Sequence, residues 1–129
     1  GLIASPGMTP YSMTKHAVVG LSNALRYEAA SFGVRVSAVC PGFVQSGIYD
    51  AGIVVNVSKE KIMENIPFRP IEAERAAQII LRGVARNKAI IIFPFYARLI
   101  WWLSRIHPAL LAPLAKKTLK DFRSSRTKP

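Results

Sequence analysis

Two residues near the start of the chain, Tyr11 and Lys15, could together move a proton. A phenol releases its proton only at about pH 10, but a neighbouring ammonium group favours the phenolate form. Residues four apart share one face of a helix, so this spacing lets the two groups act as a pair. Among the four tyrosines, Tyr11 alone has a lysine four positions later. The pair is a candidate general acid and base, and the alternative is an exposed tyrosine and lysine without chemistry.

The segment that carries this pair is expected to be a helix. Thr9 and Pro10 are typical of a helix start, because a threonine hydroxyl can cap free N–H groups and proline suits the first helical position. Gly33 can take the left-handed conformation that ends a helix. Small or apolar residues recur at the spacing of one helical face, at Thr14, Ala17, Val18, Leu21, Ala24 and Leu25.

Two short apolar runs predict strands that are buried on both faces, at residues 34–40 and 89–93. Between them, residues 71–87 predict an amphipathic helix, and residues 58–65 a shorter helical stretch. Helices are also expected at 95–106 and 109–122, separated by Pro108. This alternation is typical of an α/β fold with a parallel sheet. Because two strands cannot cover both faces and both edges of such a sheet, we expect the chain to be the second half of a larger domain.

The sequence around Tyr11 reads PGMTPYSMTKHAVVGL and is followed by LRYE, FGVRV and VCPGFVQS. This pattern resembles the active-site helix and the next strand of the short-chain dehydrogenase/reductase family, over about residues 1–47. Residues 70–94 fit the family's later helix and last strand in pattern. The resemblance implies that residues 1–94 are the C-terminal half of a Rossmann-like, doubly wound domain that binds NAD or NADP. Residues 95–129 would be a basic, aromatic helical extension.

The resemblance also assigns a role to individual residues. Tyr11 would exchange a proton with the substrate oxygen, and Lys15 would bind the nicotinamide ribose and favour the ionised phenol. Pro41 and Gly42 would turn the chain beneath the nicotinamide, and the Val44 backbone would hold the carboxamide. Ser46 stands where the family usually has threonine and keeps the hydroxyl. The implied cofactor-binding set is Tyr11, Lys15, Pro41, Gly42, Val44 and Ser46.

These roles imply an NAD(P)-dependent oxidoreductase that interconverts a secondary alcohol and a carbonyl. The resemblance implies that the apolar segment 46–68 is the substrate loop, and its composition suits a lipophilic substrate and, equally, a loop that packs on its own domain. The resemblance also implies an oligomer that forms through the Tyr11 helix. The family's glycine-rich cofactor turn and catalytic serine lie upstream of the matched residues. We therefore expect the activity in a complete parent protein and not in this fragment alone.

Charge leaves two other functions open. The net charge is +11, and almost all of it lies beyond residue 60. Residues 95–129 could therefore bind a membrane or another anionic surface, and the chain could also be a non-catalytic remnant. No nucleic-acid motif accompanies the bases, and the single cysteine and two histidines have no metal-ligand spacing. We expect a cytoplasmic protein, with membrane contact by residues 95–129 as the alternative.

Overall fold

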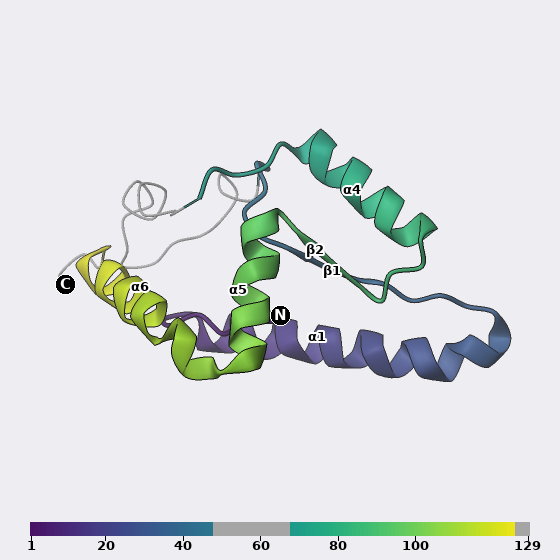
Figure 1. The fold of residues 1–129 in the computed structure, drawn as a ribbon, viewed down its shortest axis with the longest axis horizontal. Helices are drawn as coiled ribbons and strands as arrows, with labels where there is room; N and C mark the ends of the chain where they lie inside the picture. Colours follow the sequence, from purple (N-terminus) through teal and green to yellow (C-terminus); the bar gives the residue numbers. More distant parts are fainter. Residues whose placement is uncertain (48–67, 126–129) are drawn as a thin grey trace.

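The computed structural model describes residues 1–47 and 68–125. The elements in chain order are α1 (Thr9–Glu28), the 3₁₀ helix η1 (Ala29–Phe32), β1 (Ala38–Pro41), α4 (Ala73–Ala85), β2 (Ile90–Phe93), α5 (Phe95–Ile106), the 3₁₀ helix η2 (Pro108–Leu111) and α6 (Ala112–Ser125). Figure 1 shows the two strands between α4 above and α1 below. The fold is therefore mixed α/β, as predicted. The helix expected at 58–65 lies outside the described residues.

The two strands run parallel, with Ala38 opposite Ile90 and Pro41 opposite Phe93. The first strand was predicted to start at residue 34, and it starts at Ala38. β2 explains the difference, because its first residue, Ile90, already pairs with Ala38. Residues 34–37 thus have no strand partner among the described residues. Beyond β1, an isolated parallel bridge joins Val44 to Ile71, in the segment that leads into α4.

The first helix begins where the sequence predicted, but with a different cap. Met8 is the N-cap residue and makes no side-chain cap hydrogen bond, so the capping role expected for Thr9 is wrong. Pro10 lies within the first two helical positions, where its missing N–H is not needed. Gly33 has a φ of 72° and ends η1, which confirms the predicted left-handed stop.

The small core lies between α4 and the sheet. Its buried members are Ala76, Ile91 and Phe93. Gly83 lets α4 come close, because a Cβ at that position would lie 2.6 Å from Ile91 Cδ1. The partly buried residues that pack against this core are Val44, Ile71, Ile79 and Ile80. This packing fixes α4 on one side of β2.

Candidate active site

Tyr11 and Lys15 lie one turn apart near the start of α1, as their spacing predicted. The Lys15 Nζ atom is 5.4 Å from the centre of the Tyr11 ring, in the range of a cation–π contact. The Tyr11 side chain is 54% exposed, and Lys15 is also exposed. The phenol can therefore meet a substrate from outside, with a fixed positive charge beside it.

The loop before α1 is attached to the helix through Ser12. Ser12 is buried, and its hydroxyl oxygen accepts a hydrogen bond from the Ser5 backbone N–H at 3.3 Å. The Ser12 carbonyl oxygen accepts a second one from Nδ1 of His16 at 2.8 Å. Ser12 thus attaches the loop before α1 to the first turns of the helix, and its hydroxyl has a structural role here.

The turn that follows β1 is closed by an aromatic ring from α5. Tyr96 Oη accepts a hydrogen bond from the Phe43 backbone N–H at 3.1 Å, and its ring stacks on Phe68 at 3.9 Å. A Cβ on Gly42 would lie 2.6 Å from that same Oη atom. Glycine is therefore needed at position 42 for the ring to approach. Sequence reasoning missed Tyr96, since only the tertiary fold brings α5 to this turn.

Val44 leaves its own backbone groups open. The bridge to Ile71 uses the Phe43 carbonyl and the Gln45 N–H, at 3.0 and 2.8 Å. The N–H and the carbonyl of Val44 have no hydrogen-bond partner within the described residues. Among the described residues, these two groups thus offer a donor and an acceptor side by side, which matches a primary carboxamide. The expected cofactor role of the Val44 backbone fits this arrangement.

The six predicted site residues fall into two groups. Tyr11 and Lys15 share the start of α1, while Pro41, Gly42, Val44 and Ser46 follow one another at the carboxyl end of β1. Pro41 and Ser46 are exposed, and Gly42 and Val44 are half-buried. No hydrogen bond or ring contact links the two groups across residues 1–47 and 68–125. However, α1, which carries the first group, packs beside β1, which leads into the second group.

Cys40 lies at the same end of β1 but is a poor nucleophile. It is a free cysteine of intermediate exposure. Burial raises the pKa of its thiol, which disfavours the thiolate. The part of the chain that the structure describes holds no cluster of three histidine, cysteine or acidic side chains for a metal.

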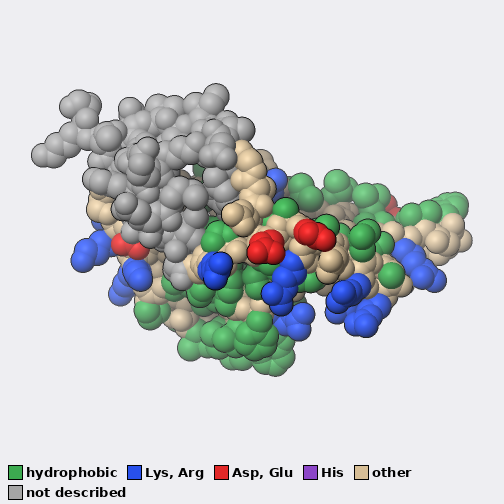
Figure 2. Space-filling model, turned by 90° about the horizontal axis from the view of Figure 1, so that it is seen from above, with side chains coloured by type: hydrophobic (Ala, Val, Ile, Leu, Met, Phe, Trp, Pro, Cys, Tyr) green, Lys and Arg blue, Asp and Glu red, His purple; other side chains and the backbone are tan. Residues whose placement is uncertain are grey.

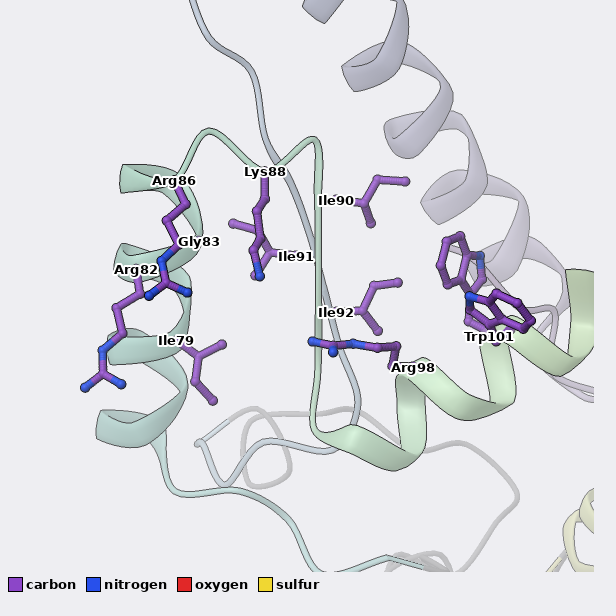
Figure 3. A pocket seen from close by; sticks show the side chains of 11 residues that line it. Ile79, Arg82, Gly83, Arg86, Lys88, Ile90, Ile91, Ile92, Arg98 and Trp101 are labelled. Atoms are coloured by element: carbon purple, nitrogen blue, oxygen red, sulfur yellow. The ribbon is translucent and has the colours of Figure 1, made fainter.

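A separate half-open pocket of about 360 Å³ lies across β2, between α4 and α5. Figure 3 shows Ile90 and Ile92 pointing to the side of Trp101, while Ile91 points towards α4. Basic side chains also line this pocket, at Arg82, Arg86, Lys88 and Arg98. The pocket contains none of the predicted site residues, so it is not part of the candidate active site.

Comparison with known proteins gives matches over the segment that holds the candidate site. A family model described as short chain dehydrogenase matches residues 1–57. The short-chain dehydrogenase anuF of Penicillium roqueforti is 38% identical over 81 residues, which are 61% of this chain and 29% of the relative. An acetoacetyl-CoA reductase of Synechocystis is 40% identical over 85 residues, 63% of this chain and 35% of the relative.

A third match extends past the pocket to the C-terminal helices. The dehydrogenase/reductase SDR family protein 7-like of Anopheles gambiae is 24% identical over 126 residues, which are 97% of this chain and 40% of the relative. The chain thus spans between 29 and 40% of the length of these three relatives.

Proposed function

Because residues 1–57 carry a segment of the short-chain dehydrogenase/reductase family, we propose that the protein is an NAD(P)-dependent oxidoreductase that interconverts a secondary alcohol and a carbonyl. The observation that carries the proposal is the placement of Lys15 Nζ 5.4 Å from the Tyr11 ring, on the first turns of a helix inside the matched segment. The similarity to named oxidoreductases supports the general reaction class.

Tyr11 is the proton donor and acceptor in this proposal. In the direction of carbonyl reduction, its phenol gives a proton to the substrate oxygen, and in alcohol oxidation the phenolate takes that proton back. The Lys15 ammonium stabilises the phenolate through its charge. When bound, the nicotinamide cofactor supplies or accepts the hydride.

The cofactor is held by residues from both groups of the site. Lys15 has three N–H donors for the ribose hydroxyls, and the N–H and carbonyl of Val44, which have no partner among the described residues, pair with the carboxamide. Pro41 and Gly42 turn the chain beneath the nicotinamide ring, and Ser46 adds a hydroxyl. Tyr96 acts as a positioning residue, because it fixes the Phe43 backbone next to Val44. The proposed cofactor is NAD or NADP.

A lipophilic alcohol or ketone is the proposed substrate class. The support is the apolar composition of residues 46–68, most of which lie outside the described residues.

We also propose that the protein is a homo-oligomer through α1. The side chains of Val18, Leu21 and Leu25 are exposed along one face of that helix, where a second copy could cover them.

Tyr11→Phe in the full-length protein tests the proposal. The assay measures oxidation of NADH and NADPH with a panel of lipophilic ketones, and cofactor binding by fluorescence. We expect turnover to fall by about 10²–10⁴-fold, because the proton donor is lost, while cofactor affinity stays unchanged. Tyr27→Phe is the matched control, since Tyr27 is 82% exposed on the same helix. Retained turnover in Tyr11→Phe would overturn the role of Tyr11.

A further inference from the structure

One face of α5 is apolar and is not covered by any described residue. Phe95, Leu99, Trp102 and Ile106 follow one another at steps of four, three and four residues, so they form one stripe along the helix. Their side chains are 75, 50, 61 and 61% exposed. Figure 2 shows hydrophobic side chains gathered at the lower edge of that view, with Lys and Arg side chains nearby. We call these four residues the α5 stripe.

A neighbouring face of α5 is fixed to the rest of the molecule. Tyr96 makes the hydrogen bond with Phe43 and the stack on Phe68 described above. The helix also packs against β2 and η2. The α5 stripe therefore faces outwards because the neighbouring face of the helix is held, and the helix cannot bury the stripe by turning.

The surroundings of the stripe are strongly basic. Arg98 and Arg105 are exposed on α5 itself, and the Arg105 guanidinium lies 6.0 Å from the Trp101 ring centre. Residues 95–125 contain six lysines and arginines and a single acidic residue, Asp121. The pocket across β2 is lined by Arg82, Arg86 and Lys88 on the side of α4, and by Arg98 and Trp101 on the side of α5. This charge suits a surface of negative groups.

We propose that α5 docks on the surface of an anionic phospholipid membrane. The α5 stripe enters the boundary between head groups and acyl chains, and Arg98 and Arg105 contact the phosphates. Tryptophan favours this boundary, since its ring is apolar and its N–H needs a polar partner. Among the described helices none has the length and apolarity to cross a bilayer. This inference does not depend on the oxidoreductase activity.

Tryptophan fluorescence of the full-length protein provides the test, because both tryptophans of this chain lie in α5. Any tryptophan elsewhere in the full-length protein is first replaced by phenylalanine. Trp101→Phe then makes Trp102 the only reporter. We expect vesicles of phosphatidylcholine with phosphatidylglycerol to shift its emission to shorter wavelength, and lipids brominated on their acyl chains to quench it. Vesicles of pure phosphatidylcholine should bind far more weakly, and salt should weaken binding to the anionic ones.

Two sets of variants separate the stripe from exposed apolar and basic residues in general. Leu99→Ser should reduce co-sedimentation with the anionic vesicles by about tenfold, because a leucine no longer enters the apolar layer. Leu81→Ser is its control, since Leu81 is 68% exposed on α4. Arg98→Gln with Arg105→Gln should also weaken binding, and Arg75→Gln, on α4, should not.

Three results would overturn the proposal. The first is absence of binding to both kinds of vesicle. The second is equal loss in Leu99→Ser and Leu81→Ser. The third is an unchanged Trp102 emission with vesicles together with a stable oligomer that Leu99→Ser dissociates, which would assign the α5 stripe to a second copy of the chain.

Discussion

The guanidinium of Arg26 donates a hydrogen bond to the carbonyl oxygen of Asn87, with Nη2 and the oxygen 3.0 Å apart. Arg26 lies in the last turn of α1, and Asn87 lies in the turn between α4 and β2. A second bond from the same guanidinium reaches the Val36 carbonyl. One side chain thus joins the helix that carries Tyr11 to both segments that lead into the sheet.

Replacing Arg26 should therefore destabilise the fold of the protein. We expect Arg26→Met to lower the free energy of unfolding by about 1–3 kcal/mol. The substitution removes the charged donor, and the carbonyls of the half-buried residues Val36 and Asn87 then lose their hydrogen-bond partner. Urea unfolding followed by circular dichroism measures the change. Arg35→Met is the control, because Arg35 is exposed and should give no comparable loss. Equal stability of the two variants would mean that the contact contributes little.

Lys15 should affect both binding and chemistry. In Lys15→Met, we expect the Michaelis constant for the nicotinamide cofactor to rise and turnover to fall, each by about tenfold or more, because the ammonium both donates hydrogen bonds and favours the phenolate. Steady-state kinetics of the full-length protein gives both values. Lys116→Met, on α6, is the matched control. If neither value changes in Lys15→Met, the lysine has no part in the site.

Gly42 and Tyr96 should show coupled effects on stability. Gly42→Ala should cost about 1–3 kcal/mol of unfolding free energy, because its Cβ would meet the Tyr96 hydroxyl. Tyr96→Phe removes that oxygen, so the double variant should lose less than the two single variants together. Gly20→Ala should have the opposite sign, since nothing lies within 4 Å of a Cβ on that helical residue. Additive losses in the double variant would contradict the contact.

Local pattern was enough for most of the secondary structure. Periodicity placed α5 at 95–106, where the structure has it, and Gly33 was identified as a stop because few other residues tolerate a positive φ. The i to i+4 spacing of Tyr11 and Lys15 gave their contact directly. These features are determined by residues that are close in sequence, so the sequence of one chain is enough to predict them.

The features that the sequence could not supply depend on partners far along the chain. The start of β1 at Ala38 depends on where β2 begins. Thr9 does not cap the helix because it is already the first helical residue, and the N-cap position falls on Met8. The role of Tyr96 appears only when α5 reaches the turn after β1. The secondary-structure propensity of a residue does not indicate which distant segment of the chain will contact it.

The long-range contacts described above also constrain how the protein folds. Phe43 and Tyr96 are 53 residues apart, and Arg26 and Asn87 are 61 apart. Each contact closes a long loop, so the chain must lose the conformational entropy of that loop before the contact can stabilise the fold. The helices, which need only local bonds, can form early, whereas the strand pair must wait for β2. During synthesis, therefore, α1 and β1 leave the ribosome before β2, the strand with which β1 pairs, has been made.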